Sequence, residues 1–518
     1  MKHKILRWLL LVLLVGFGLR LVNLGGRTLW YDEAFAVLFA RTGLTNMLYG
    51  TLTPVTGGAA DIHPLLYYTI LNGWLRIVGQ TPAMVRLFSV FAGTLTIALV
   101  FRLATDLFDH QVGLVAAVIT ALAPFHIQYS QEARMYALLT LLLLLATWNY
   151  RRAWGQPTTR AGWAWWLVFA ISAALAMYTQ QLAAFYLAAL GLTPVLFRRW
   201  DKLLPTFLAA GLAFVLYLPW FVNLPGQLDK LQAYYWIQRP TLARPLLTMR
   251  SFIVVALDIP PQWALPTFLV SLILVVFLLL QVAVRWRKMR RAEQRAIGWL
   301  LWLSFGSLTL MWLASQILLP VYLERALLAQ GVILYCALAW LVVRGGLPRP
   351  ILLILIAAWA LVILVGYTYQ VTWHTFPNSP FDQAARWLED NTTPNDAIIH
   401  SNKLTALPLV YYSPELAQSY LADRPGSAED TLALPTQEVL DLFGEPCIAA
   451  AANRANRVWF VIFEREIAQY LAAPNNEQPH LNWLRSHYAE KEPVRFADLL
   501  IIPFDNPEDY APLCAGGS

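Results

Sequence analysis

Charged residues are scarce in this chain. Of its 518 residues only 13% are Asp, Glu, Lys or Arg, whereas 58% are hydrophobic. Soluble globular domains carry about 25% charged residues, so this composition excludes an ordinary soluble protein. The apolar runs are mostly about 16–22 residues long, the length that an α-helix needs to cross roughly 30 Å of hydrocarbon. The sequence therefore predicts a polytopic α-helical membrane protein surrounded by membrane lipids.

Signatures of metal, nucleotide and acyl-transfer sites are also missing. The chain has only 3 cysteines, and no spacing of its His, Cys, Asp and Glu residues resembles a set of metal ligands. It contains no Walker loop, no GxSxG elbow and no dinucleotide fingerprint. We therefore expect no metal site and no required cofactor, while a need for a divalent cation stays open.

The excess of basic residues indicates membrane topology and not a nucleic-acid partner. The net charge is +7, but the basic residues stand in short clusters between apolar runs. Residues 1–24 lack a small-x-small cleavage site, so we expect a retained signal-anchor helix with its N-terminus inside. We expect about eleven spans, at residues 5–22, 83–103, 112–128, 133–150, 163–180, 182–197, 204–222, 264–284, 296–317, 322–343 and 350–371. This order places every basic cluster in the cytoplasm, as the positive-inside rule requires.

The apolar segment 64–79 is a possible twelfth span. Counting it would export the basic cluster 285–295, so we expect a helix that lies in the outer interface. The outer face then receives the following segments: the first outer loop 23–82, the turn 124–133, the loop 223–263, the turn 318–324 and the chain from 372. Tyr234, Tyr235 and Trp236 in the third of these either cover a cavity or stack on a sugar, or else anchor the membrane interface.

The C-terminal part is less hydrophobic and indicates a second domain. We expect a transmembrane domain over residues 1–371 and a small extracytoplasmic α/β domain over 372–518. Sequence periodicity predicts helices at 381–390 and 481–488, and strands at 396–401, 457–463 and 496–504. Cys447 and Cys514 would share an oxidising compartment, so we expect them to form a disulfide.

Four polar groups lie near the outer membrane edge, where charges are expensive and therefore candidates for function. They are Asp32 with Glu33; Asp61 with His63, Tyr67 and Tyr68; Gln131 with Glu132, Arg134 and Tyr136; and Glu324 with Arg325. Asp32 and Glu33 are adjacent acids and partly desolvated, so we expect both pKa values to rise.

Two of these groups predict an anion site. Pro124 and Pro320 precede inward-running spans, which would place Arg134 and Arg325 in the first turns of their helices. A helix N-terminus favours an anion, and an arginine there favours a phosphate. With the acidic pair on the same face, the pattern indicates a reaction between a membrane-held phosphate and a group that loses a proton.

Structural explanations exist for each group. Asp32 and Glu33 could be a solvated loop pair. Each arginine could extend to the membrane interface or form an ion pair with its neighbouring glutamate. His63 before Pro64 is more often a loop residue than a ligand.

Five segments resemble glycosyltransferase family 39 of the GT-C class, which includes relatives of protein O-mannosyltransferases and of lipid A aminoarabinose transferases. These segments are LWYDEAFA at 29–36, HPLLYY at 63–68, APFHIQYSQEARMYAL at 123–138, YTQQLAAFYLA at 178–188 and YLERALL at 322–328. The similarity extends over about residues 1–340. Many relatives carry YTHY where this chain has YTQQ from Tyr178, so the role of that histidine has no counterpart here.

The resemblance implies a GT-C-like membrane enzyme that takes a hexosyl or pentosyl group from a polyprenyl-phosphate donor at the outer face. The acceptor would be a lipid, a protein or a glycan. By motif position Asp32 would be the catalytic carboxylate and Arg325 would bind phosphate. Our hypothesis makes Asp32 the base in an inverting displacement, with Glu33 orienting Asp32 or the acceptor and Arg134 assisting Arg325. Further site candidates are Glu132, His63, Tyr67, Gln131 and Tyr178.

Two other functional classes stay open at this point. A lipid-linked sugar flippase or other transporter would also use anion-binding helix ends, but its charges would gather near the membrane midplane. A membrane-anchored binding protein would leave the charges at several span ends unexplained. The clustering of these residues at one face favours the enzyme.

Overall fold

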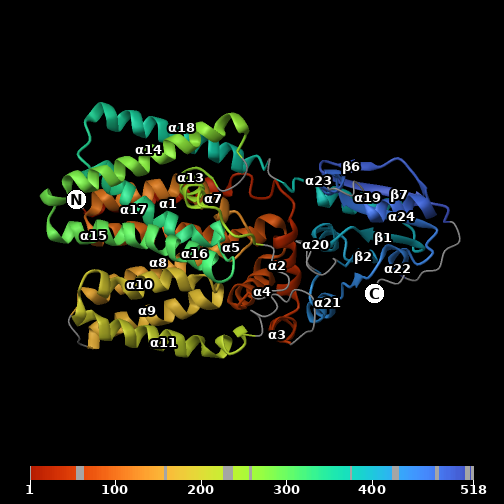
Figure 1. The fold of residues 1–518 in the computed structure, drawn as a ribbon, viewed down its shortest axis with the longest axis horizontal. Helices are drawn as coiled ribbons and strands as arrows, with labels where there is room; N and C mark the ends of the chain where they lie inside the picture. Colours follow the sequence, from red (N-terminus) through yellow and green to blue (C-terminus); the bar gives the residue numbers. More distant parts are fainter. Residues whose placement is uncertain are drawn as a thin grey trace.

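The computed structural model describes residues 2–53, 63–156, 160–225, 237–255, 259–373, 376–422, 431–472, 478–507 and 514. Figure 1 shows a bundle of long helices at one end and an α/β domain at the other, with short helices between them. The first helix begins at the free end of the bundle, and the last strand lies in the α/β domain.

Each expected span falls on a helix or on consecutive helices, but the expected number of eleven spans is not confirmed. The helices of the bundle are α1 (Lys2–Leu21), α5 (Pro82–Leu107), α6 (His110–Leu122), α7 (Pro124–Ser130), α8 (Tyr136–Trp154), α9 (Arg160–Thr179), α10 (Ala183–Leu196), η1 (Trp200–Lys202), α11 (Leu203–Phe221), α13 (Arg244–Ile253), α14 (Pro261–Arg285), η2 (Trp286–Lys288), α15 (Arg291–Leu301), η3 (Trp302–Gly306), α16 (Ser307–Ile317), η4 (Glu324–Leu327), α17 (Leu328–Arg344) and α18 (Arg349–Val371). In the described ranges, 7 helices are long and apolar enough to cross a membrane, or 8 if the bent pair α6–α7 is one span. The chain is a polytopic helical membrane protein.

One expected span is broken. The segment 112–128 was expected to be a single helix, but α6 and α7 meet at an angle of 61°. Pro124 begins α7 and has no N–H to continue the ladder of α6. The buried Arg20 guanidinium of α1 donates instead to the carbonyls of Thr120 and Ala121, at 3.2 and 3.1 Å. The bend carries residues 131–135 toward the site described below.

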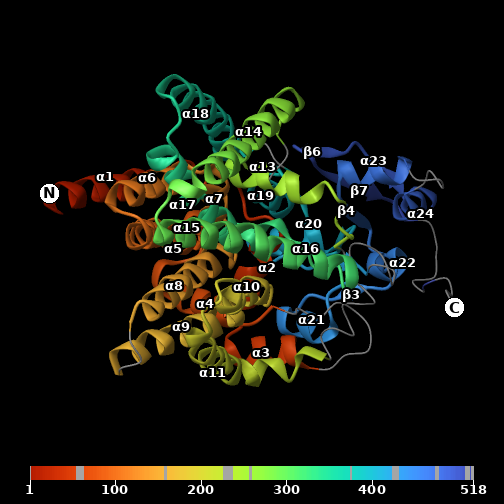
Figure 2. The same ribbon diagram turned by 60° about the vertical axis from the view of Figure 1, so that its left-hand side comes forward.

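Helix α17 is the centre of the bundle. Its residues from Leu328 to Leu341 are all buried, and it packs against α6, α8, α14 and α15. Figure 2 shows α14 and α18 on one side of the bundle and α9, α10 and α11 on the other. Because α17 is held on all sides, the turn η4 that precedes it is held as well.

Three short helices form a layer between the bundle and the α/β domain: α2 (Tyr31–Arg41), α3 (Leu44–Leu52) and α4 (Leu66–Val78). The helix expected within 64–79 is therefore present. Phe39 of α2 packs edge-on against Tyr68 of α4, with ring centroids 5.4 Å apart. Helix α2 also contacts the α/β domain through α20 (Lys403–Tyr412). Helix α2, which carries Asp32 and Glu33, is therefore packed between α4 and the α/β domain.

The C-terminal domain contains a sheet of 7 described strands in the order β3-β2-β1-β4-β7-β5, with β6 paired to β7. Its remaining elements are α19 (Phe381–Asn391), β1 (Asp396–His400), β2 (Gln418–Leu421), α21 (Leu434–Leu440), β3 (Gly444–Glu445), α22 (Ile448–Ala452), β4 (Arg457–Phe463), α23 (Glu464–Ala472), α24 (Pro479–His487), β5 (Ala489–Glu490), β6 (Val494–Phe496) and β7 (Leu499–Asp505). Strands β1 to β4 are parallel, and β7 runs antiparallel to β4. The predicted helices and strands of this domain are confirmed.

The expected disulfide is present in the C-terminal domain. Cys447 precedes α22 and is bonded to Cys514, with a Cα–Cα distance of 5.7 Å. The bond ties the end of the chain to the sheet across 67 residues.

Candidate active site

Asp32 lies between two arginines from distant parts of the chain. Its Oδ2 accepts a hydrogen bond of 2.8 Å from Nη1 of Arg325 and lies 3.8 Å from Nε of Arg134. Arg134 also donates to the main-chain carbonyl of Asp32 at 3.1 Å. The Asp32 side chain is 14% exposed, and Arg134 is 4% exposed. The structure therefore unites the carboxylate and both predicted phosphate-binding arginines.

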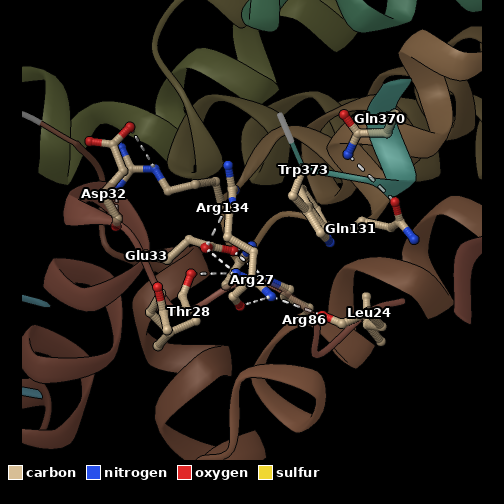
Figure 3. Close-up of polar contacts among 12 residues, drawn as sticks. Leu24, Arg27, Thr28, Asp32, Glu33, Arg86, Gln131, Arg134, Gln370 and Trp373 are labelled. Atoms are coloured by element: carbon tan, nitrogen blue, oxygen red, sulfur yellow. Dashed lines mark hydrogen bonds and ion pairs between the residues drawn. The ribbon is translucent and has the colours of Figure 1, made fainter. Parts of the chain in front are cut away.

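The adjacent Glu33 points to a different set of partners. Its carboxylate is fully buried and accepts two hydrogen bonds from Arg86, at 2.8 and 2.6 Å. The Ala133 amide donates to it at 2.8 Å, and Nη2 of Arg27 lies 3.7 Å away. Figure 3 shows Glu33 directed toward Arg86 and Arg27 while Asp32 points away from them. Glu33 thus joins α2 to α5 and to the turn that carries Arg134.

The expectation that both carboxyl pKa values rise is wrong. Burial alone would raise the pKa of Asp32, but Arg134 and Arg325 outweigh it and hold that pKa below its usual value. Burial also opposes ionisation of Glu33, and Arg86 again reverses the effect and lowers the pKa. Both groups are carboxylates at neutral pH, because a close cation favours the charged form.

Arg86 is the residue that sequence reasoning missed. It is fully buried in the first turns of α5, and besides Glu33 it donates to the carbonyls of Leu24 and Arg27, both at 2.8 Å. It therefore fixes the loop that leads into α2. A charged residue inside an expected span is a functional candidate by default, and Arg86 in the span 83–103 carried that signal.

Arg134 and Arg325 do not stand in the first turns of α-helices, as was expected. Arg134 precedes the first residue of α8, and Arg325 lies in η4, a single 3-10 turn before α17. Both nevertheless lie on the N-terminal side of a buried helix, where the helix dipole is positive. The guanidinium of Arg325 also lies over the ring of Tyr136, with its carbon 5.3 Å from the ring centroid.

Glu324 fixes the turn η4, and with it the backbone of Arg325, through contacts with α13. Its carboxylate lies 3.1 Å from Nε of Arg244 and accepts hydrogen bonds from Thr248 and Ser251, at 3.1 and 3.4 Å. These three partners belong to α13. Glu324 therefore connects η4 to α13 and does not pair with its neighbour Arg325.

Glu132 is the unusual acid of the site. It is only 8% exposed, and its side chain makes no ion pair or hydrogen bond with the residues that the structure describes. Burial raises its pKa to about 7, although Arg325 opposes the shift, while Glu33 and Asp32 add to it. Glu132 can therefore exchange a proton in the physiological pH range, where Asp32 and Glu33 stay ionised.

The remaining candidates divide into two sets. His63 and Tyr67 lie within electrostatic range of the site: His63 lowers the pKa of Asp32, and Arg134 partly opposes the rise that burial causes in the pKa of Tyr67. Gln131 instead donates to the carbonyls at the end of α1 and meets Gln370 of α18, on the far side of Trp373 from Asp32 in Figure 3.

Tyr178 is engaged elsewhere in the bundle. Its hydroxyl donates to the carbonyl of Leu216 on α11 at 3.1 Å, and its ring packs against Tyr217. Asp61 and the aromatic residues 234–236 fall outside the described residues.

The loop before α2 is also bonded to the C-terminal domain. Thr28 donates to the carbonyl of Ser379 at 2.8 Å, and the amide of Leu29 donates to the Tyr412 hydroxyl at 2.9 Å. The position of Asp32 therefore depends on the bundle, through its arginines, and on the α/β domain, through this loop.

Comparisons with known proteins agree with this architecture. The family described as dolichyl-phosphate-mannose-protein mannosyltransferase has a sequence model that matches residues 62–222, about a third of the chain. No curated protein sequence matches the chain significantly.

Solved structures match almost the whole chain. The structure of ArnT from Cupriavidus metallidurans, bound to undecaprenyl phosphate, is 12% identical and has a TM-score of 0.64, and the match covers 96% of this chain and 98% of that chain. The oligosaccharyltransferase AglB from Archaeoglobus fulgidus, in complex with an inhibitory peptide and a dolichol-phosphate, is 14% identical with a TM-score of 0.52, over 94% and 73% of the two chains. This chain is therefore a polytopic membrane protein with the fold of the GT-C glycosyltransferases.

Proposed function

We propose that this protein is an inverting glycosyltransferase that moves a sugar from a polyprenyl phosphate to an acceptor hydroxyl. The observation that carries the proposal is the Asp32 carboxylate held between Arg134 and Arg325. The similar ArnT and AglB structures contain undecaprenyl phosphate and a dolichol-phosphate, which supports a lipid phosphate as the donor.

The chemistry of such a donor suits this set of residues. A sugar joined through C1 to a phosphate has a leaving group that departs as an anion and needs no proton. A glycosidase requires two carboxyl groups, one of them as an acid. Transfer from a phosphate requires one base for the acceptor and cations for the leaving group. Asp32 is the base in this proposal, and Arg325 and Arg134 stabilise the departing phosphate.

The ion pairs of Asp32 link donor binding to its basicity. Without donor, the two arginines hold the Asp32 carboxylate and keep its pKa low. A donor phosphate competes for the same guanidinium groups, because Arg binds phosphate and carboxylate in the same geometry. As the arginines turn toward the phosphate, Asp32 loses their stabilisation and becomes a stronger base. The acceptor proton is therefore taken most readily when the donor is in place.

Glu33 has a supporting part in this mechanism. Its carboxylate is occupied by Arg86, Arg27 and the Ala133 amide, so it positions α2 and leaves the proton transfer to Asp32. The helix places the two neighbouring side chains about 100° apart, since an α-helix has 3.6 residues per turn. One acid can therefore be structural while the other faces the reactants.

We place the site and the α/β domain, residues 372–518, on the outer face of the cell membrane. This orientation follows from the basic clusters, which stand at the opposite end of the bundle and mark the cytoplasmic side. The transferred group is a hexosyl or pentosyl residue, and the acceptor is a lipid, a protein or a glycan that reaches the layer of α2 and α4 from outside.

A transfer assay tests the proposal directly. Purified protein is incubated with radiolabelled polyprenyl-phosphate sugar and cell envelope, and the product is analysed for the anomeric configuration at C1. Label in a new product with inverted configuration is expected. Label that crosses a liposome membrane without entering a product would instead identify a transporter, and retained configuration would exclude a single displacement.

Replacing Arg325 with alanine should weaken use of the donor. A hydrogen bond to a charged group contributes about 1.5–3 kcal/mol, so kcat/KM for the donor should fall about 10- to 150-fold. Steady-state kinetics at varied donor concentration measure this effect. Arg386→Ala is the control, because Arg386 forms an exposed pair with Asp382 on the α/β domain. An equal loss in both variants would exclude a specific role of Arg325.

Glu132 should make donor binding depend on pH. Above its pKa of about 7 it adds a negative charge beside Arg325, which repels the donor phosphate. The KM for the donor should therefore rise between about pH 6 and pH 8, and Glu132→Gln should abolish this rise. Kinetics at several pH values measure it. A Glu132→Gln enzyme with the wild-type pH profile would assign the dependence to another group.

A further inference from the structure

A cavity lies at the end of the bundle away from Asp32. Its volume is about 210 Å³, and its lining includes Tyr150 and Arg151 of α8, Arg199 after α10, and Arg295 of α15. Helix α8 begins beside the candidate active site and spans 19 residues, or roughly 28 Å at 1.5 Å per residue. That length is close to the hydrocarbon thickness of a bilayer. The cavity is therefore at the depth of the opposite membrane interface.

The charge around this cavity is unbalanced. Its lining contains Arg151, Arg199 and Arg295 but neither Asp nor Glu. Arg199 forms a pair with Asp201, with Nη2 and Oδ2 2.7 Å apart. Within the described part of the chain, Arg151 and Arg295 make no ion pair, whereas the neighbouring Arg152 is paired with Asp106 at 3.5 Å. Two guanidinium groups from different helices thus face one cavity whose lining has no acid, although the charge of Asp106 also acts on Arg151 from outside the lining.

A second cavity at the same end provides a contrast. It has a volume of about 330 Å³ and is lined by Arg285, Lys288 and Arg344, but also by Glu293. Arg344 is paired there with Glu293 at 3.3 Å. General enrichment of basic residues on the cytoplasmic side explains this second cavity, where the protein supplies its own acid. The same enrichment does not explain why the lining of the first cavity contains no acidic residue.

The other walls of the first cavity are apolar and aromatic. They include Trp154 and Trp299 besides Tyr150, and rings of this kind are typical of the level of lipid headgroups. The Trp299 indole donates to Thr193 at 3.2 Å, so the aromatic wall is anchored to α10. A ligand with a phosphate beside the arginines and acyl chains along the aromatic walls would match both the charged and the apolar lining of the cavity.

We propose that this cavity binds the phosphate of an anionic membrane phospholipid. Basic pockets between transmembrane helices on the cytoplasmic side are suited to such headgroups, and an arginine matches a phosphate better than a lysine does. The bound lipid connects α8, α10 and α15. The inference is independent of the proposed glycosyl transfer, since the cavity and Asp32 are at opposite ends of α8.

Native mass spectrometry of the full-length protein with added lipid tests this inference. Phosphatidylglycerol, phosphatidylcholine, undecaprenyl phosphate and inorganic phosphate are titrated separately into three proteins. These are wild type, the double variant Arg151→Gln with Arg295→Gln, and a control, Arg285→Gln with Lys288→Gln, which removes the same charge from the second cavity. Phosphatidylglycerol should bind wild type and control with similar affinity, and the first double variant about 10-fold or more weakly. Phosphatidylcholine should bind all three alike.

Three outcomes would overturn the inference. They are equal loss of phosphatidylglycerol binding in both double variants, binding of inorganic phosphate that matches the lipid, and a retained complex only with undecaprenyl phosphate. The last result would assign the cavity to the carrier lipid. Should the double variant fail to fold in phosphatidylcholine, the single variant Arg295→Gln serves the same comparison, because Arg295 is exposed.

Discussion

Replacing Asp32 with asparagine should lower the rate of sugar transfer by about 10²–10⁴-fold, the usual contribution of a general base. Asparagine has nearly the same shape and can still accept the hydrogen bond from Arg325, so the fold of the site should be retained. It cannot take a proton from the acceptor. The measurement is single-turnover transfer at saturating donor, which separates the chemical step from donor binding.

The control for this variant is Asp382→Asn, which removes an acid that is paired with Arg386 on the surface of α19. It should transfer sugar at the wild-type rate. Both proteins are first checked for equal thermal unfolding in detergent. An Asp32→Asn enzyme that is well folded and turns over normally would remove Asp32 from the chemistry, and Glu132, with its pKa of about 7, would become the stronger candidate for the base.

Replacing Arg86 with leucine should destabilise the protein by about 3–5 kcal/mol, the cost of leaving one charge of a buried pair without its partner. Glu33 would stay fully buried with only the more distant Arg27 to balance it. The loop before α2 would also lose the donors to the carbonyls of Leu24 and Arg27. The midpoint of thermal unfolding and the yield of folded protein in detergent measure the effect.

Two further variants make this prediction specific. Arg102→Leu changes the same residue type on the same helix, but Arg102 is 50% exposed in its pair with Asp106, so the loss should be only about 0–1 kcal/mol. The double variant Arg86→Leu with Glu33→Leu should recover part of the stability, because no unpaired charge remains. If Arg86→Leu were as stable as Arg102→Leu, the pair with Glu33 would not hold α2 in place.

The same pair gives a pH dependence of stability. The pKa of Glu33 in the folded protein lies below its ordinary value of 4.5. The stabilisation by Arg86 is therefore complete above about pH 4.5 and is lost as the pH falls through the lowered pKa. Glu132 has the opposite sign, because its raised pKa favours the folded state at low pH and this contribution disappears as the pH rises through about 7.

Local sequence patterns were sufficient for the helices and strands. The length of an apolar run depends only on neighbouring residues, and so the helices α5, α14 and α18 lie where they were expected. Short continuous apolar runs along β4 and β7 identified both strands for the same reason. The break before Pro124 was not predicted, because apolar residues continue past the proline. In the structure the carbonyls left free at the end of α6 accept hydrogen bonds from Arg20 of another helix.

The sequence by itself determined that this is a polytopic membrane protein with a C-terminal α/β domain. It also predicted that Asp32, Arg134 and Arg325 lie in one site. Only the tertiary structure decided how the charges pair. Adjacent acids were expected to repel each other, but Glu33 meets an arginine 53 positions away and Asp32 meets one 293 positions away. The physical reason is that a buried carboxylate takes its pKa from the cations within a few ångströms, and these are brought there by packing between distant helices.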